Sequence, residues 1–149
     1  MTDLYFAYAS NLHSPRMRER VRSARALGPS LLTGFQFTLD KPSRDGSAKA
    51  NLHAQPGGCV WGVVYSLDPS DWARLDACEP GYHRQRVKIR ADDAVREADT
   101  YLSPLRCEEA VAFHWYKRLI VDGAREHGLP SAWIDFLEEL PARPDPTRA

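Results

Sequence analysis

The sequence has few of the features that mark membrane-bound, secreted or disulfide-bonded proteins. No apolar run in its 149 residues approaches the roughly 20 residues that a helix needs to span a bilayer. The N-terminus has no basic segment followed by a long apolar stretch, as a signal peptide would. The cysteines Cys59, Cys78 and Cys107 include no C-x-x-C pair, which favours a reducing compartment. We therefore expect a cytoplasmic protein without a membrane partner.

Motifs for cofactors and metals are also missing. Neither G-x-G-x-x-G nor G-x-x-x-x-G-K-[ST] occurs in the chain, so no phosphate-binding loop of either kind is expected. The histidines are scattered, and none has the H-x-x-x-H spacing of a metal site. The sequence therefore predicts neither a metal ion nor a cofactor.

Charge of one sign is not in excess, because 20 Lys and Arg balance 20 Asp and Glu. This balance argues against a strongly basic nucleic-acid-binding protein, and we expect no nucleic-acid partner. The charges are nevertheless segregated, since residues 16–25 hold five arginines and residues 68–79 hold four carboxylates. We interpret the basic segment as a solvated helix face. The alternative is an RNA-associated protein that uses the Arg16–Arg25 helix.

The chain is long enough for one domain with its own core. A protein of this length buries roughly 70% of the surface of its unfolded chain, and 43% of the residues are hydrophobic. No internal repeat or linker divides the sequence. We expect one domain over residues 1–140 and a flexible tail over residues 141–149, in which three of nine residues are proline.

Hydrophobic patterning predicts five strands and four helices. Apolar or alternating runs bounded by turn residues indicate strands over residues 4–9, 35–39, 59–67, 82–90 and 97–103. Helical patterns extend over residues 15–24, 70–78, 109–122 and 131–140. Since several strands follow one another without an intervening helix, we predict an α+β domain with a curved, mixed sheet of five to six strands.

Glycine, proline and polar residues predict where the strands and helices begin and end. We expect a break at Gly28-Pro29, a loop over residues 40–49 and a turn at Gly57-Gly58. Ser14 is the expected N-cap of its helix, with Pro15 at the first helical position. Gly62, inside an apolar run, indicates a bulge or a close approach of two backbones.

One carboxylate lies on the apolar side of its predicted helix. Trp72, Leu75 and Glu79 are three and four residues apart, so they share one helix face. Burial there would raise the pKa of Glu79 toward neutrality, as a general acid/base at pH 7 requires. The alternative is that Glu79 lies beyond the helix end and points into solvent.

The strand end Tyr8-Ala9-Ser10-Asn11 is a second candidate site. A strand that stops at small polar residues before a helix exposes consecutive backbone N–H groups, and such a turn can bind an anion. The alternative is an ordinary connection between a strand and a helix.

Four segments, in order along the chain, resemble the γ-glutamylcyclotransferase family. Residues 5–12, YFAYASNL, resemble its YFAYGSNL signature, and residues 60–65, VWGVVY, match its VWGVVY strand. Residues 75–79, LDACE, resemble its LDxxE segment, with Tyr82 following. Tyr116 and residues 123–130, GAREHGLP, resemble its Y…GAxExGLP segment. These segments extend over most of the chain.

The resemblance implies a small mixed β-barrel and the release of 5-oxoproline from a γ-glutamyl small molecule. We expect a monomer or homodimer. It implies that Glu79 is the catalytic acid/base. It also implies substrate binding by Tyr5, Phe6, Ala7, Tyr8, Ala9, Ser10, Asn11 and Tyr116. The leaving amine can be an amino acid, glutathione or another amine. The alternative is a non-catalytic binding or regulatory module of the same fold.

Two features of the sequence each allow two interpretations within this family. Ala9 replaces the glycine of the signature, which costs of order 1 kcal/mol if that position needs a positive φ and little if it needs only a small side chain. The cations are 16 Arg and 4 Lys. This bias either reflects composition alone or supplies an arginine for the carboxylates of an anionic γ-glutamyl substrate.

Overall fold

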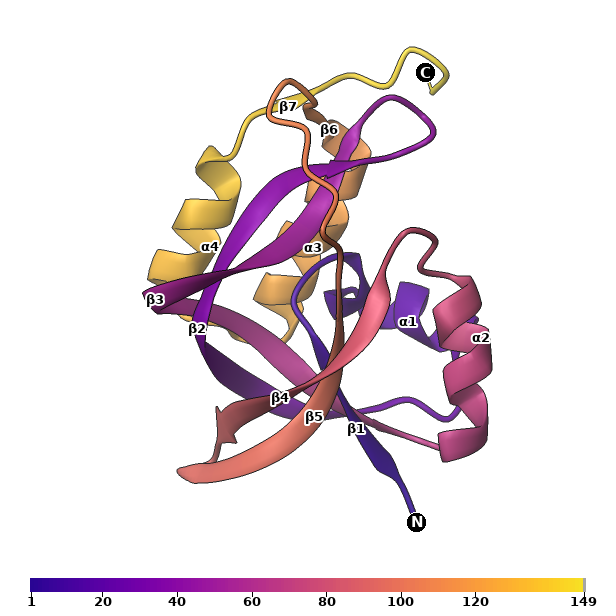
Figure 1. Cartoon of the computed structure of the whole chain (residues 1–149), viewed down its shortest axis with the longest axis vertical. Coiled ribbons are helices and arrows are strands. Elements are labelled where there is room, and N and C mark those ends of the chain that lie inside the picture. The colour runs from indigo at the N-terminus through magenta and orange to yellow at the C-terminus, as the bar shows by residue number, and fades with distance from the viewer. Residues whose placement is uncertain (149) are drawn as a thin grey trace.

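A closed five-stranded β-barrel forms the centre of the computed structural model, which describes residues 1–148 (Figure 1). Around the barrel the strand order is β1-β3-β2-β4-β5. The parallel pairing of β1 with β5 closes it, and its other strand pairs are antiparallel. The strands are β1 (Asp3–Ala7), β2 (Arg25–Pro42), β3 (Ala48–Leu67), β4 (His83–Ala91) and β5 (Ala94–Leu102). The mixed barrel confirms the predicted α+β class.

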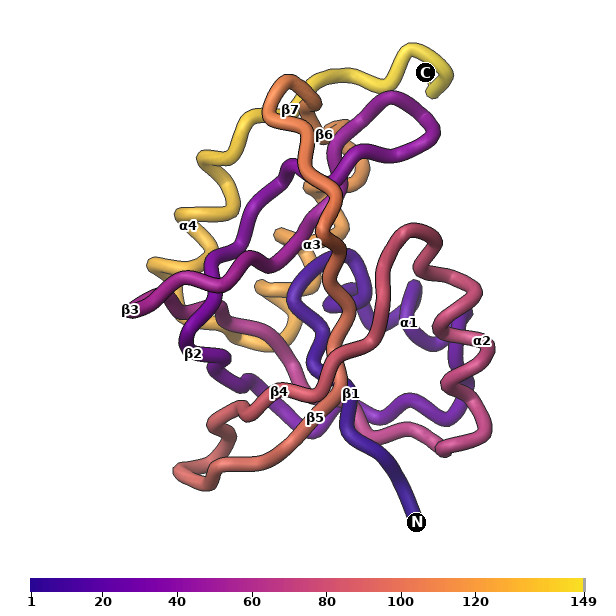
Figure 2. The backbone as a smooth tube through the Cα atoms, in the orientation of Figure 1, coloured from indigo at the N-terminus to yellow at the C-terminus, as the bar shows by residue number. Residues whose placement is uncertain are grey.

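Helices cover the barrel on two sides (Figure 2). α3 and α4 lie along the long β2–β3 hairpin, whereas α1 and α2 lie together on the other side of the molecule (Figure 1). The α-helices are α1 (Ser14–Arg20), α2 (Trp72–Ala77), α3 (His114–Glu126) and α4 (Ser131–Glu139). The 3-10 turns η1 (Ser10–Leu12) and η2 (Pro69–Asp71) precede α1 and α2, and the short strands β6 (Ala112–Phe113) and β7 (Ala142–Arg143) form a separate parallel pair.

β2 and β3 are much longer than predicted. The expected break at Gly28-Pro29 lies inside β2, and the expected turn at Gly57-Gly58 lies inside β3. The register of the pair shifts between Ala26 and Gly28, because a bulge absorbs an extra residue without ending the ladder. The loop predicted over residues 40–49 is correspondingly reduced to the turn over residues 43–47.

Two of the predicted helices have different ends in the structure. The helix predicted over residues 15–24 ends at Arg20, because the chain turns into β2 a few residues later. His13, not Ser14, is its N-cap, and the His13 side chain accepts a hydrogen bond from the Arg16 N–H. The helix predicted over residues 109–122 begins only at His114, because the two preceding residues pair with β7.

The C-terminal segment, predicted as a flexible tail, contributes contacts to the domain. β7 lies in this segment and pairs with β6. The Trp115 indole N–H donates a hydrogen bond to the Asp145 carboxylate at 2.9 Å. The Arg148 guanidinium lies 3.9 Å from the centre of the Trp115 ring. Ala149, the last residue of the tail, lies outside the described residues.

Gly62 allows β1 and β3 to approach each other closely, as the sequence predicts. A Cβ atom at this position would lie 2.3 Å from the Ala7 carbonyl oxygen and 2.7 Å from the Phe6 ring. Phe6 and Ala7 are fully buried, so neither can move away into solvent. This contact sets the position of the last residues of β1, from which the chain enters the turn at Tyr8–Asn11.

We predict that Gly62→Ala destabilises the protein by about 1–3 kcal/mol, because the added methyl group overpacks a closed contact. Chemical denaturation monitored by circular dichroism measures this loss. Cys59→Ala, at an exposed position of the same strand, is the matched control and should change stability little. Equal stability of the two variants would contradict the close contact.

Candidate active site

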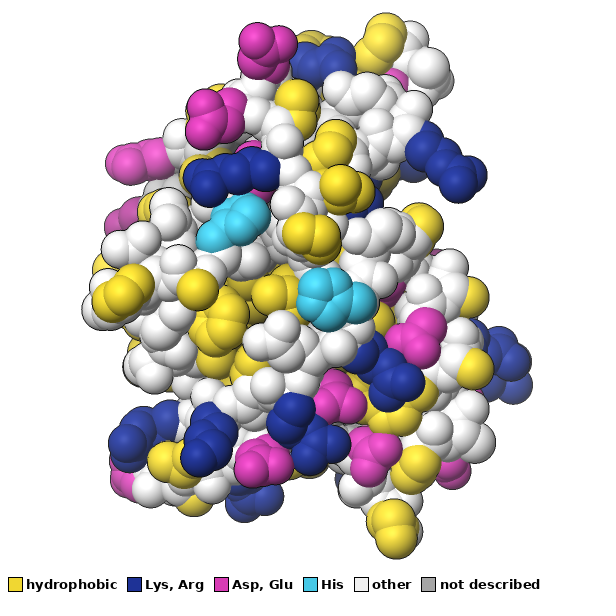
Figure 3. Space-filling model, viewed as in Figure 1, with side chains coloured by type: hydrophobic (Ala, Val, Ile, Leu, Met, Phe, Trp, Pro, Cys, Tyr) yellow, Lys and Arg dark blue, Asp and Glu magenta, His cyan; other side chains and the backbone are white. Residues whose placement is uncertain are grey.

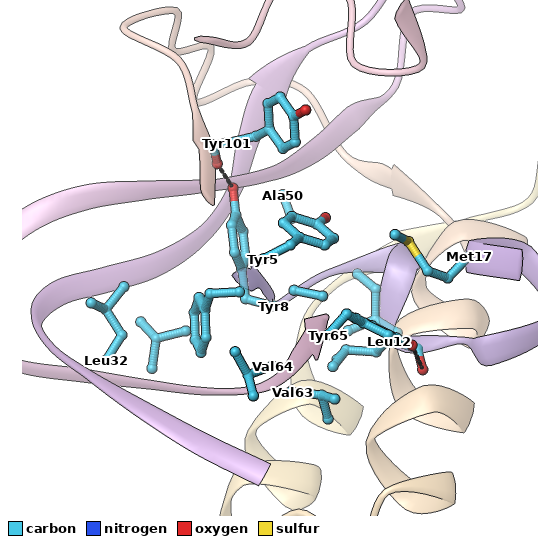
Figure 4. Close-up of a cluster of buried hydrophobic side chains, with 14 of the residues drawn as sticks. Tyr5, Tyr8, Leu12, Met17, Leu32, Ala50, Val63, Val64, Tyr65 and Tyr101 are labelled. Carbon is cyan, nitrogen blue, oxygen red and sulfur yellow. Dashed lines mark hydrogen bonds between the residues drawn. The ribbon is translucent and has the colours of Figure 1, made fainter. Parts of the chain in front are cut away.

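A small cavity of about 30 Å³ lies where β1 ends and the chain turns into η1. Five tyrosines, one carboxylate and the turn after β1 surround it. Its lining residues are Tyr5, Tyr8, Ala9, Ser10, Asn11, Ala50, Glu79, Tyr82, Tyr101 and Tyr116. Figure 4 shows Tyr5, Tyr8 and Tyr101 close to Ala50, with the Tyr8 hydroxyl donating to the Tyr101 carbonyl at 2.6 Å.

Glu79 supplies the carboxylate of this cavity. It follows Cys78, the C-cap of α2, so it lies just beyond the helix. Trp72 and Leu75, on the same side of α2, are buried. The Glu79 side chain is only 16% exposed, so it faces the interior rather than solvent, as the helical spacing predicts.

Two donors converge on one oxygen of Glu79. Asn11 Nδ2 lies 3.1 Å from Oε1, and an Arg20 guanidinium nitrogen lies 3.2 Å from the same atom. No described residue donates a hydrogen bond to Oε2. Oε1 therefore holds the carboxyl group in place, and Oε2 is free to accept or give a proton.

Burial sets the acidity of Glu79. It raises the pKa of this carboxyl above its ordinary value, because the charged form loses solvation, while Arg20 and the Asn11 hydrogen bond act in the opposite direction. The net direction is upward. A raised pKa is the property that a carboxyl needs to exchange protons near neutral pH.

Asn11 acts as a connector rather than a free binding group. Its Nδ2 also donates to the Tyr5 hydroxyl at 2.9 Å, and its Oδ1 accepts from Arg20 at 3.3 Å. Asn11 is 3% exposed, so its amide is committed to these neighbours. It joins Glu79 to β1 and to α1, and it orients the carboxyl group.

Ala9 and Ser10, which line the cavity, have backbone N–H groups without an acceptor in residues 1–148. No described residue accepts a hydrogen bond from the N–H groups of Ala9, Ser10 or Asn11. Ala9 has φ −128°, so this position does not require the left-handed conformation that favours glycine. Alanine in place of the glycine of the signature therefore carries no strain of that kind.

Two of the tyrosines keep a hydroxyl proton for a ligand. Tyr8 and Tyr82 donate theirs to backbone carbonyls. Tyr116 Oη instead accepts from the Ala50 N–H at 3.0 Å, and Tyr5 Oη accepts from Asn11. Burial raises the pKa of Tyr5 and Tyr116 far above the ordinary phenol value, so both remain protonated donors at neutral pH.

Phe6 and Ala7, which the sequence analysis included among the substrate-binding residues, do not line the cavity. Both are fully buried in the barrel core, where they pack against Gly62. The Phe6 side chain points to the opposite face of β1 from Tyr5, because successive side chains in a strand alternate. Their contribution is packing, and the prediction of substrate contact is corrected.

A larger cavity of about 150 Å³ adjoins the first. The two share Ser10, Glu79, Tyr82 and Tyr116. Four cations line the larger one: Arg16, Arg20, Lys41 and Lys49. Arg16 and Arg20 therefore face a cavity, which corrects their interpretation as part of a solvated helix face, whereas Arg18, Arg22 and Arg25 are exposed.

Sequence reasoning missed several of these residues. The sequence places Tyr82 only after the LDACE segment, and no local pattern indicates that Tyr101 and Ala50 line the site. No local feature distinguishes Arg20 from the other four arginines of residues 16–25. Within residues 1–148, His, Cys, Asp and Glu form no group of three placed to hold a metal ion, and none of the helices is long and apolar enough to cross a membrane.

Comparisons with known proteins agree with this arrangement. A sequence model of the AIG2-like family matches residues 59–137. Human γ-glutamylcyclotransferase is 32% identical, over 93% of this chain and 77% of the human protein. The bovine γ-glutamylcyclotransferase is 30% identical, over 92% of this chain and 78% of the relative. A solved structure named as a γ-glutamyl cyclotransferase has a TM-score of 0.90 at 28% identity, covering 100% of this chain and 93% of that one.

These similarities span nearly the whole chain and include both the barrel and the segments that form the cavity. Sequence and fold thus agree on one conclusion: this chain belongs to the γ-glutamylcyclotransferase family of enzymes.

Proposed function

We propose that this protein releases 5-oxoproline from a γ-glutamyl amino acid or a related γ-glutamyl compound. The observation that carries the proposal is Glu79, a buried carboxyl with one oxygen free of hydrogen bonds, in the wall of a cavity that also presents unpaired backbone N–H groups. Membership of the γ-glutamylcyclotransferase family supports the same class of reaction.

The proposed reaction is an internal exchange of one amide for another. The α-amine of the γ-glutamyl group attacks its own γ-carbonyl carbon, which closes a five-membered ring. The bond from that carbon to the γ-linked nitrogen then breaks, and the leaving amine departs. Holding the substrate curled supplies much of the rate, since proximity in well-oriented intramolecular reactions is worth several kcal/mol.

Glu79 Oε2 would move the proton in this reaction. The α-ammonium must lose a proton before it can attack, and the leaving nitrogen must gain one before it can depart. A single carboxyl with a raised pKa can do both in sequence. The hydrogen bonds of Asn11 and Arg20 to Oε1 keep Oε2 directed at the substrate.

The rest of the cavity would bind and orient the γ-glutamyl group. The N–H groups of Ala9 and Ser10 would bind its α-carboxylate or the oxyanion that develops on the γ-carbonyl. Tyr116, whose hydroxyl proton has no acceptor among the described residues, would donate to the substrate. The buried Tyr8 ring would form part of the apolar wall.

We predict that Glu79→Gln lowers the turnover of γ-glutamyl-alanine by roughly 10³-fold, because glutamine cannot exchange the proton. The protein should remain folded, since glutamine preserves the acceptor for Asn11 and Arg20. The measurement is 5-oxoproline release, with circular dichroism to check folding. Glu139→Gln, at an exposed position, is the control and should retain wild-type activity.

Two outcomes of that assay would contradict the proposal. Near wild-type 5-oxoproline release by Glu79→Gln would remove Glu79 from the mechanism. Binding of γ-glutamyl-alanine by the wild-type protein without any 5-oxoproline would instead identify a non-catalytic binding module of the same fold.

We also predict that Arg20→Met moves the acidic limb of the pH profile of kcat/KM to higher pH, by about one unit. The Arg20 charge lowers the pKa of Glu79, so its removal leaves Glu79 protonated over a wider pH range, and activity then appears only at higher pH. Arg18→Met, an exposed neighbour on the same helix, should leave the limb unchanged. Loss of activity at every pH without a shift would indicate a purely structural role for Arg20.

A further inference from the structure

The larger cavity combines an unusual number of cations with direct access to Glu79. Its volume is about 150 Å³, and it is lined by Arg16, Arg20, Lys41 and Lys49. The first two lie on α1, Lys41 lies near the end of β2, and Lys49 lies near the start of β3. Glu79 is the one carboxylate in the lining, so the cavity has a strong excess of positive charge.

Two of these four cations, Arg16 and Lys41, have no carboxylate partner among the described residues. Arg20 pairs with Glu79, and Lys49 lies 3.4 Å from Asp45. No carboxylate of residues 1–148 lies within 4.0 Å of the cationic nitrogens of Arg16 or Lys41. The Arg16 Nε is buried and has no hydrogen-bond partner among the described residues. A buried donor without an acceptor costs free energy, which an anionic ligand would recover.

Some cations on the outer surface pair with carboxylates of neighbouring elements. Arg86 and Asp99 are 2.6 Å apart on β4 and β5, and Arg125 and Glu138 are 2.6 Å apart on α3 and α4. In Figure 3, cationic and acidic side chains lie next to one another along the lower edge of the molecule. Arg86 and Arg125 thus have the carboxylate partners that Arg16 and Lys41 lack among the described residues.

The position of the cavity indicates which part of a substrate it would hold. Under the proposed function, the γ-glutamyl group lies in the small tyrosine-lined cavity, and Glu79 protonates the leaving nitrogen. The leaving group must then extend from a point within reach of Glu79. The larger cavity begins there, because the two cavities share Ser10, Glu79, Tyr82 and Tyr116.

We propose that Arg16, Lys41 and Lys49 determine specificity by binding carboxylates of the leaving group, and that the preferred leaving group is an amino acid with an acidic side chain. This inference rests on the proposed function. Lys49 already has Asp45 nearby, so a single carboxylate would leave either Arg16 or Lys41 without an anionic partner, whereas the two carboxylates of an acidic amino acid match both. A basic leaving group would be repelled by the same residues.

Lys41 and Lys49 are held in position for this role. Lys41 Nζ donates to the Pro80 carbonyl at 3.0 Å and lies 4.7 Å from the centre of the Tyr82 ring. Lys49 Nζ lies 4.5 Å from the centre of the Tyr116 ring. Burial lowers the pKa of both lysines, because their charged forms lose solvation, while Glu79 acts in the opposite direction on Lys41 and Asp45 does so on Lys49. These contacts restrict both ammonium groups, and Lys41 has no carboxylate partner among the described residues.

The test is the release of 5-oxoproline from three γ-glutamyl dipeptides. γ-Glutamyl-glutamate and γ-glutamyl-glutamine have nearly the same shape and differ in one carboxylate. We expect kcat/KM to be at least about tenfold higher for γ-glutamyl-glutamate than for γ-glutamyl-glutamine, and lowest for γ-glutamyl-lysine. The ratio should fall as salt is raised from 0.05 to 0.5 M, because salt screens charge interactions.

Single substitutions test which residues produce the preference for γ-glutamyl-glutamate. Arg16→Met, Lys41→Met and Lys49→Met should each bring the glutamate-to-glutamine ratio closer to one, whereas Lys41→Arg, which keeps the charge, should preserve it. Lys88→Met, at an exposed position of β4, is the matched control and should not change the ratio. Thermal unfolding of each variant shows whether it is folded, and the ratio is compared only among folded variants.

The outcomes separate this inference from the proposed function. If all three dipeptides are turned over with similar kcat/KM, the cyclotransferase activity stands and the preference for acidic leaving groups is wrong. If none yields 5-oxoproline, the proposed function itself fails. If the preference exists but survives in all three Met variants, other residues recognise the leaving group and the assignment is wrong.

Discussion

The hydrogen bonds from Asn11 and Arg20 to one oxygen of Glu79 are the contact on which the site depends. They join the end of α2 to two neighbouring segments that lie far from it in sequence, the turn after β1 and the helix α1. A buried carboxylate without such partners would be strongly destabilising. With both donors on Oε1, the carboxyl is held in one orientation, and its second oxygen remains available for proton exchange with a substrate.

The barrel provides the rigid frame for that contact. The parallel pairing of β1 with β5 closes the sheet, and Gly62 lets β3 pack directly against the end of β1. The chain must then turn at Tyr8, where the barrel core ends. Because the turn is fixed at this point, its free N–H groups, the surrounding tyrosines and Glu79 share one small cavity. The chemistry of the site thus follows from strand packing.

The tertiary structure also explains the separation of charge along the sequence. The basic segment of α1 and the acidic segment that ends at Glu79 are far apart in the chain, and they meet through the Arg20–Glu79 ion pair. Arg16 and Arg20 face the cavity while their neighbours face solvent. The molecule therefore combines a tyrosine-rich cavity, whose one carboxyl group is Glu79, with an adjoining cationic cavity, and Glu79 lines both.

Local patterns in the sequence determined the fold class, the approximate positions of α2, α4, β4 and β5, the close approach at Gly62 and the burial of Glu79. These features depend on residue spacing and side-chain size, which are local. Only the tertiary structure decided that β2 and β3 continue past the glycines that looked like chain breaks, through shifts in the register of the pair. It also decided that Phe6 packs in the core and that Tyr101, Ala50 and Arg20 face the cavities. Such placements depend on strand register and helix docking, which couple residues that are distant in sequence.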